Sequence, residues 1–89
     1  MTEEQIRDLI LNELGNIAPE ADIDSVDPDA DLREALDIDS LDFLNFLAAL
    51  HKKAGVIVPE ADSAKLLTLN AAVSYVAARL RTHSAERSI

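Results

Sequence analysis

The side chain with the clearest chemical potential in this sequence is the hydroxyl of Ser40, within the tetrapeptide DSLD at residues 39–42. A serine acts as a nucleophile when a base such as histidine lies within about 3 Å of it. His51 follows on the same predicted helix, which places it about 16 Å along the helix axis from Ser40. His83 lies near the end of the sequence, and no G-x-S-x-G motif is present. We therefore exclude an intrinsic serine hydrolase.

Three alternating aspartates, Asp27, Asp29 and Asp31, match the first three ligand positions of an EF-hand calcium loop. The rest of the loop does not match. Leu32 stands where the loop turns on a glycine, and Ile38 stands where a bidentate glutamate should be. The sequence therefore does not predict an EF-hand, and we assign no metal ligands. A weak divalent-ion site on this loop stays an alternative.

Ser40 is better explained as a residue to which another enzyme attaches a group. A helix N-terminus offers free backbone N–H groups and the positive end of the helix dipole, so a phosphate ester is favoured there. An Asp-Ser pair before an apolar run is also typical of an ordinary helix cap. The residues by themselves leave both roles open.

Helices at the two ends of the sequence must support this site. The first begins after Thr2, which can form a capping box with Gln5, and we expect it to end at Gly15. The last begins near Thr68, a suitable N-cap. Both show apolar residues at helical spacing, namely Ile6, Leu9, Ile10 and Leu14 in the first and Leu69, Ala72, Val73, Val76 and Leu80 in the last.

The second long helix carries Ser40 itself and is expected over Ser40–Ala54, with Gly55 as its stop. Its apolar residues cover a wide stripe: Leu41, Phe43, Leu44, Phe46, Leu47, Leu50 and Ala54. A stripe of this width predicts burial on more than one side of the helix, or the wall of an internal pocket.

The connection over residues 16–39 is unusually long for a small domain. Four apolar residues are spaced so that they can pin it across the bundle: Ile23, Val26, Leu32 and Leu36. A short helical turn is expected at 32–36, an extended link at 56–59, and one or two helical turns at 61–66. The sequence therefore predicts an all-α fold, a small bundle of three main helices plus one short helix, with a long loop between the first two.

Composition limits the remaining function classes. The 89 residues make one domain, and 48% apolar residues are enough for a core. Cysteine is absent, which excludes disulfides and thiolate chemistry. The net charge of −9 argues against nucleic acid as a partner. An acidic N-terminus and the lack of a long apolar run predict a cytoplasmic protein without a membrane span. We expect it to be a monomer.

Several motifs in a fixed order resemble the acyl carrier protein family. Asp39-Ser40-Leu41 is similar to the family's 4′-phosphopantetheine attachment motif, and Val58-Pro59-Glu60 resembles the Ile-Pro-acidic link after its second helix. The segment from Leu66 to Val76 resembles the opening of the family's last helix. The resemblance covers about residues 31–77 without insertions. It implies an acyl carrier domain over residues 1–81 and a flexible tail over 82–89.

The resemblance implies a function for each part. A phosphopantetheinyl transferase would esterify Ser40 with the 4′-phosphopantetheine of coenzyme A, and the thiol of this cofactor would carry acyl groups as thioesters. Partner enzymes that activate, transfer or condense acyl groups would recognise Asp39, Leu41 and Asp42 through basic docking patches. Five residues match positions that line the family's acyl pocket: Leu47, Leu50, Val58, Leu66 and Val76. The carrier itself would not be an enzyme.

The sequence departs from the family pattern at two places. Asp37 stands where the family usually has a glycine. The second helix of fatty acid carriers is acidic, but the matching positions here are Asn45, His51, Lys52 and Lys53. These differences favour a carrier of a specialised lipid or polyketide pathway over the housekeeping carrier of fatty acid biosynthesis. An aminoacyl or peptidyl carrier and an unmodified acidic adaptor, with Ser40 only as a cap, remain alternatives.

Overall fold

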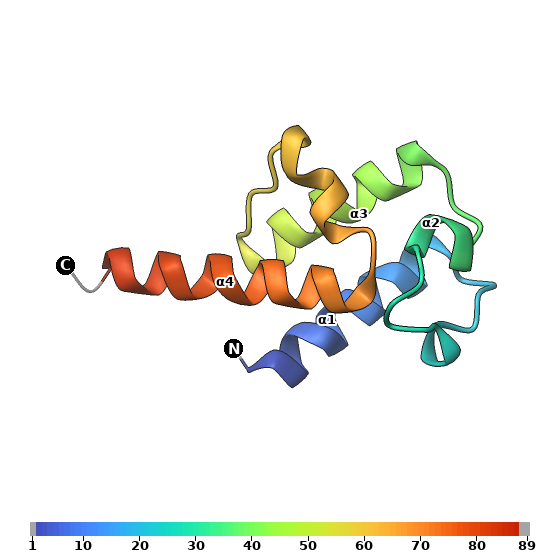
Figure 1. The fold of residues 1–89 in the computed structure, drawn as a ribbon, viewed down its shortest axis with the longest axis horizontal. Helices are drawn as coiled ribbons and strands as arrows, with labels where there is room; N and C mark the ends of the chain where they lie inside the picture. Colours follow the sequence, from blue (N-terminus) through green and yellow to red (C-terminus); the bar gives the residue numbers. More distant parts are fainter. Residues whose placement is uncertain (1, 88–89) are drawn as a thin grey trace.

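The computed structural model describes the backbone of residues 2–87 and the side chains of residues 2–81. The chain order is α1 (Glu3–Ile17), η1 (Ile23–Ser25), α2 (Leu32–Ala35), α3 (Ser40–Ala54), η2 (Glu60–Leu66) and α4 (Leu69–Arg87). Figure 1 shows α1, α3 and α4 as the three long helices, with α2 and the first connection at one end. No strand is present within the described residues. The predicted all-α bundle is confirmed.

The predicted helix starts are confirmed by their capping bonds. Gln5 N donates to Thr2 Oγ1 (3.1 Å) and Thr2 N donates to Gln5 Oε1 (2.8 Å), which completes the capping box of α1. Ala71 N donates to Thr68 Oγ1 at the start of α4 (3.0 Å). Each bond satisfies a backbone group that a helix end would otherwise leave free.

Two glycines were expected to end helices, and only one does. Gly55 lies in the left-handed region (φ 72°) and its N–H donates to His51 O, so it closes α3 as predicted. The expected end of α1 at Gly15 is wrong. The helix continues to Ile17, and Ala18 N donates to Leu14 O. Two more apolar positions, Ile17 and Ala18, thereby pack against the core.

The long first connection is fixed across the bundle, as the spacing of its apolar residues predicts. Leu32 and Leu36 are buried, whereas Ile23 and Val26 are partly buried against the core. Backbone bonds also join it to the start of α4, because Leu32 N donates to Leu67 O (2.7 Å) and Asn70 N donates to Pro28 O (3.0 Å). The connection therefore holds α2 and the start of α3 in place without a long helix of its own.

The core is formed mainly by α1, α3 and α4. Only one side of α3 is buried, through Phe43, Phe46, Leu47 and Leu50. The rings of the two phenylalanines lie 5.8 Å apart at a tilt of 44°. Of the two alternatives predicted for the wide apolar stripe, burial on more than one side is wrong, since Leu41 is 66% exposed and Leu44 is 49% exposed. The other alternative, a pocket wall, is considered with the site below. The surface of α3 thus keeps apolar side chains beside Ser40.

The helix α4 runs past the other helices toward the C-terminus (Figure 1). The backbone of residues 82–87, within the predicted tail, continues α4, and residues 88–89 lie outside the described residues. The domain end at residue 81 and the flexibility of the tail stay predictions. None of the helices in the described part of the chain is long and apolar enough to cross a membrane.

Candidate functional site

Ser40 is the first residue of α3 and its side chain is exposed. The N-cap is Asp39, whose carboxylate accepts a hydrogen bond from Asp42 N (2.8 Å). The hypothesis that Ser40 caps the helix is therefore wrong, because a cap residue precedes the first helical residue. No hydrogen bond involves the Ser40 hydroxyl among the described residues. The hydroxyl therefore contributes no hydrogen bond to the fold among the described residues, and a group can be attached to it without breaking one.

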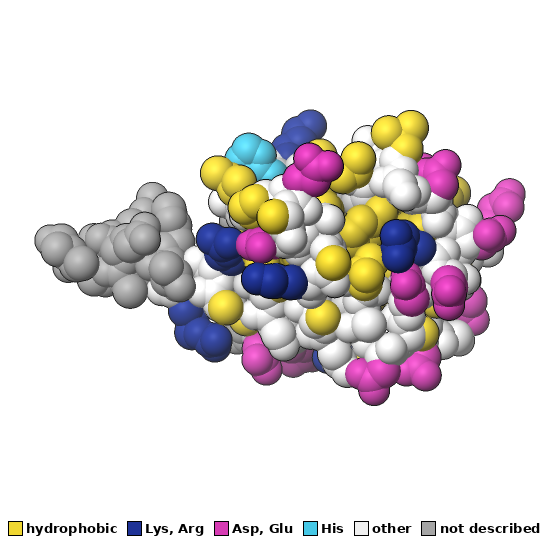
Figure 2. All heavy atoms as spheres, turned by 45° about the horizontal axis from the view of Figure 1, so that its top comes forward, with side chains coloured by type: hydrophobic (Ala, Val, Ile, Leu, Met, Phe, Trp, Pro, Cys, Tyr) yellow, Lys and Arg dark blue, Asp and Glu magenta, His cyan; other side chains and the backbone are white. Residues whose placement is uncertain are grey.

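Ser40 lies between two opposite electrostatic influences: the partial positive charge of the N-terminus of α3 and the negative charges of neighbouring aspartates. The first N–H groups of α3 and the helix dipole favour a phosphate on the hydroxyl. Asp39 and Asp42 flank it, and Asp37 lies just before them. Figure 2 shows acidic side chains gathered around the end of the molecule where α2 and the start of α3 lie. This charge would attract cationic groups of an approaching molecule to the same end.

The turn that leads into α3 is a helix C-cap in which an aspartate takes the place of glycine. Asp37 follows α2 and has φ 54°, the only positive φ of a non-glycine residue within the described chain. Ile38 N donates to Arg33 O (3.0 Å), which is the long bond of a Schellman motif. Aspartate tolerates the left-handed region better than most residues. Asp37 therefore closes α2 in a left-handed conformation that glycine usually adopts.

We expect Asp37→Val to be less stable than Asp37→Gly by about 1 kcal/mol, because a β-branched side chain is strained at positive φ. Urea denaturation followed by circular dichroism measures the difference. The matched pair Ala48→Val and Ala48→Gly lies at an exposed position inside α3. There the order should reverse, since glycine is the poorer helix former. Equal stability of the two Asp37 variants would show that this turn carries no strain.

The aspartates of the first connection have structural roles in this fold. Asp27 Oδ1 accepts a hydrogen bond from Asp29 N (2.9 Å), and Asp31 Oδ1 accepts one from Arg33 N (2.9 Å) at the start of α2. Asp29 Oδ1 accepts from the amide of Asn70 in α4 (2.9 Å). Arg33 lowers the pKa of Asp31 below its usual value, mainly through the hydrogen bond from its backbone N–H and then through the bond from its side chain. The acidic run thus builds the loop that precedes the site.

Two grooves lie along the surface that carries Ser40. One, of about 510 Å³, is lined by the end of α1 and by Asp37, Ile38 and Asp42. The other, of about 350 Å³, lies between α3 and the link after it, and includes Leu47 and Val58. Apart from Asp42, which is half-buried and lines the first groove, the predicted recognition residues are exposed around Ser40. These residues therefore lie beside the candidate attachment site, and their role in recognition stays a prediction.

The five predicted pocket residues are divided between the second groove and the buried core. Leu47 and Val58 line the second groove, whereas Leu50, Leu66 and Val76 are fully buried in the core. His51 also lines this groove, and it is followed by Lys52 and Lys53 in the last turn of α3. The role of these five residues in holding cargo stays a prediction.

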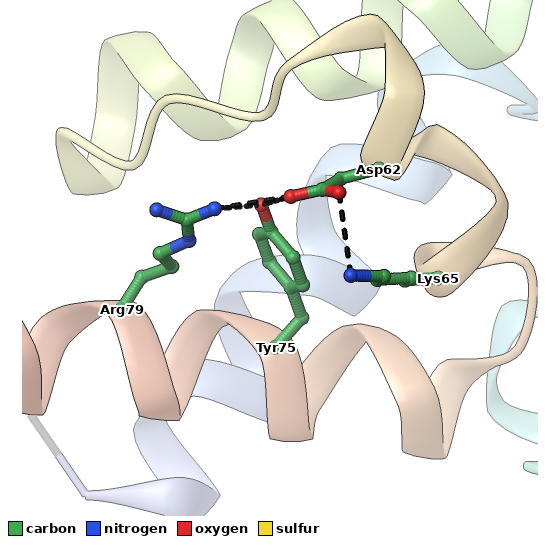
Figure 3. Close-up of polar contacts among 4 residues, drawn as sticks. All are labelled: Asp62, Lys65, Tyr75 and Arg79. Atoms are coloured by element: carbon green, nitrogen blue, oxygen red, sulfur yellow. Dashed lines mark hydrogen bonds and ion pairs between the residues drawn. The ribbon is translucent and has the colours of Figure 1, made fainter.

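Sequence reasoning missed a polar cluster between η2 and α4, drawn in Figure 3. The Tyr75 hydroxyl donates to Asp62 Oδ2 (2.8 Å) and accepts from Arg79 (2.8 Å). Arg79 also donates to Asp62 Oδ2 (3.0 Å), and its guanidinium lies 5.0 Å from the centre of the Tyr75 ring. Lys65 lies 3.3 Å from the second carboxylate oxygen. The spacing of Tyr75 and Arg79 by four helical residues was the available signal.

This cluster predicts a specific pH dependence of stability. The hydrogen bond from Tyr75, then Lys65 and Arg79, holds the pKa of Asp62 below its usual value of 3.8. Because the folded pKa is lowered, the contribution to stability is complete above pH 3.8 and disappears as the pH falls through the folded value. We expect Asp62→Asn to reduce the free energy of unfolding near neutral pH, and the difference from the wild type to vanish in strong acid. Urea titrations across this range measure it; a difference that grows on acidification would contradict the assignment.

Residues 4–76 match the protein family described as "Phosphopantetheine attachment site". An acyl carrier protein from Campylobacter hominis is 33% identical over 73 residues, which cover 82% of this chain and 86% of that protein. Acyl carrier proteins from two strains of Nitratidesulfovibrio vulgaris are 34% identical over 74 residues, covering 83% of this chain and 91% of theirs. The chain therefore belongs to the phosphopantetheine-attachment family and is similar to its acyl carrier proteins.

The family match confirms the resemblance that the motifs indicate and extends it toward the N-terminus, through most of α1. It also identifies the cofactor as a covalently attached 4′-phosphopantetheine group, which is what this family carries. An exposed hydroxyl without a hydrogen-bond partner at the start of α3 fits such a group, because a phosphodiester there meets free backbone N–H groups.

Proposed function

We propose that this chain is an acyl carrier whose 4′-phosphopantetheine is attached to Ser40. The observation that carries the proposal is the exposed, unpartnered hydroxyl at the first residue of α3, inside the span that matches the family. A phosphopantetheinyl transferase would join the Ser40 oxygen to the phosphorus of phosphopantetheine, with the nucleotide part of coenzyme A as the leaving group. The hydroxyl proton would pass to a base of the transferase or to water.

The proposed carrier performs no catalysis of its own. Its thiol holds an acyl group as a thioester while enzymes that activate, transfer or condense acyl groups act on it. Because the cargo is tethered, each docked enzyme meets it at a high effective concentration. The carboxylates of Asp39 and Asp42 supply the charge that guides basic partner surfaces to Ser40. We propose that this chemistry takes place in the cytoplasm, where coenzyme A would be available as the donor.

We place the carrier in a specialised lipid or polyketide pathway. The support is the charge of α3, which is acidic at its start but ends in His51, Lys52 and Lys53. A partner that fits this helix must differ from one that binds a uniformly acidic helix. An aminoacyl carrier would share the modification, but the relatives compared above are named acyl carrier proteins. This similarity favours acyl cargo.

The proposal is tested by incubating the purified chain with coenzyme A and a broad-specificity phosphopantetheinyl transferase. Intact mass spectrometry should show one added phosphopantetheine group, and peptide mapping should place it on Ser40. The chain that carries phosphopantetheine is then incubated with an acyl-transferring enzyme or with an amino-acid-adenylating enzyme. Attachment of an acyl group to the thiol should be faster than attachment of an amino acid. A folded chain that gains no mass would instead support an unmodified adaptor.

A further inference from the structure

The exposed apolar side chains of this protein gather in one region. Within the described residues, the large apolar side chains that are exposed are Leu41, Leu44 and Ile57. The first two lie on α3, and Ile57 lies in the extended link that follows this helix. Leu44 and Ile57 both line the second groove, of about 350 Å³. Scattered apolar side chains are normal on a protein surface, but a contiguous patch indicates a surface that another molecule covers.

This apolar region is continuous with the candidate attachment site. Ser40, Leu44 and Ala48 follow one another at intervals of four residues, and His51 comes three residues later. Residues at these intervals lie along one side of a helix. Leu44, Ala48 and His51 line the second groove, which therefore begins about one helical turn from Ser40 and reaches about 16 Å along the helix axis. A molecule that approaches Ser40 along this side of α3 passes over the groove.

The surface of α3 is acidic at its start and cationic at its end. Asp39 precedes Ser40, whereas Lys52 follows His51 and is exposed. The side chain of Lys52 forms no hydrogen bond or ion pair within the described part of the chain. In Figure 2, a histidine and a cationic side chain lie next to exposed apolar side chains, away from the end where acidic side chains gather. The helix dipole favours cations at this end, but it does not account for the apolar side chains beside them.

The charges around the second groove also set the orientation of a bound molecule. Glu60 lines the groove from the side of the link, and Lys52 lies next to its α3 side. A carboxylate on a bound molecule is repelled by Glu60 and attracted by Lys52. It is therefore expected over the end of α3, where the imidazole of His51 can also donate a hydrogen bond to it.

We propose that the second groove and the cationic end of α3 form a docking site for a partner protein that presents an apolar side chain next to a carboxylate. The same partner carries cations for Asp39 at the other end of α3, so its surface has both signs of charge with an apolar residue between them. A uniformly cationic partner is disfavoured, because it would place a like charge against Lys52. That the partner is an enzyme acting on cargo at Ser40 rests on the proposed function.

Two synthetic helical peptides test the docking site on the unmodified chain. Both carry the same stripe of leucines. The mixed-charge peptide has lysines at one end and glutamates at the other, and the all-lysine peptide has lysines at both ends. In NMR titrations of the isotope-labelled chain, the mixed-charge peptide should shift the amides of Leu44, His51 and Ile57. The all-lysine peptide should shift mainly the amides of the acidic first connection, because the net charge of the chain is −9.

Lys52→Glu should weaken binding of the mixed-charge peptide by about 3- to 10-fold, because attraction becomes repulsion at an exposed site. High salt should remove this difference. Arg81→Glu is the matched control, since it makes the same change of charge at an exposed position of α4 that does not line the groove. Its effect should stay below about 2-fold. Ile57→Ala should weaken the same peptide by about 3- to 20-fold, because apolar contact in the groove is lost.

The docking site is overturned if the mixed-charge peptide shifts no amides of the groove, or if its affinity is unchanged by both Lys52→Glu and Ile57→Ala. Sedimentation of the unmodified chain without peptide tests the other occupant. A dimer that dissociates in these two variants would show that the face binds a second copy of the chain, and the proposed partner would be wrong.

The loaded chain tests whether enzymes use this docking site. With an acyl-transferring enzyme that acts on the loaded chain, Lys52→Glu should raise KM by about 3- to 10-fold and leave kcat unchanged, because the contact serves binding and not the chemical step. Arg81→Glu should change neither. An unchanged KM for Lys52→Glu would contradict this use of the site. Failure to load Ser40 would count against the proposed function, while the peptide titrations still decide the docking site.

Discussion

Replacement of Ser40 by alanine should abolish modification by the phosphopantetheinyl transferase completely. The change removes the one oxygen that the proposed phosphodiester needs. The variant should fold as stably as the wild type, because Asp39 caps α3 and the Ser40 hydroxyl has no hydrogen-bond partner among the described residues. Intact mass spectrometry after incubation with coenzyme A and the transferase measures the modification, and urea denaturation measures the stability.

Ser74→Ala provides the matched control, since Ser74 is an exposed serine inside α4. This variant should accept one phosphopantetheine group as the wild type does. If Ser40→Ala gained the same mass as the wild type, the attachment site would lie elsewhere. If Ser40→Ala were clearly less stable, the hydroxyl would have a structural role that the hydrogen bonds of the folded chain do not reveal.

Phe46→Ala should lower the free energy of unfolding by about 3–5 kcal/mol, because truncating a large buried side chain leaves a cavity. Phe46 is fully buried on α3, and its ring packs at a tilt against that of Phe43. A domain of this size is stable by about 5–13 kcal/mol in total. We therefore expect a large fraction of the variant molecules to be unfolded, or to unfold at low urea concentration. Urea denaturation followed by circular dichroism gives the difference.

Leu41→Ala is the control for this prediction, because it shortens an apolar side chain on the same helix that is 66% exposed. Its effect on stability should stay within about 0.5 kcal/mol. Comparable losses for the two variants would mean that Leu41 is buried in solution, for example between two copies of the chain. Sedimentation at several concentrations would then detect the dimer and would contradict the monomer expected from the sequence.

Much of the fold could be predicted from the sequence, because interactions between residues close along the chain determine where helices begin and end. The capping box at Thr2, the cap at Thr68 and the left-handed stop at Gly55 depend on residues within four positions of each other. The same holds for the bounds of α3 and hence for the position of Ser40 on it. The motifs around Ser40 also identified the family, because their types and spacing suffice for that purpose.

Two predictions that were wrong, the end of α1 and the burial of α3, depend on contacts with residues that are distant along the chain. Gly15 looked like a helix stop, but Ile17 and Ala18 gain contacts with the core when α1 continues. The apolar stripe of α3 was expected to be buried on more than one side, yet Leu41 is 66% exposed and Leu44 is 49% exposed. Burial depends on which segments reach a surface, and periodicity within one helix does not contain that information.

The sequence by itself determined the class of fold, the family, the cofactor and the candidate attachment residue, because each rests on local patterns or on an ordered set of motifs. The sequence did not distinguish Ser40 from Asp39 as the helix cap; the structure shows that Asp39 caps α3 through a local bond to Asp42 N and that the Ser40 hydroxyl has no partner among the described residues. Only the tertiary structure decided the contacts between elements. It brought Asp62 to Tyr75 and Arg79, which are separated from it by 13 and 17 positions along the chain. The physical reason is that hydrogen bonds between elements depend on how the helices pack, and packing is a property of the whole chain.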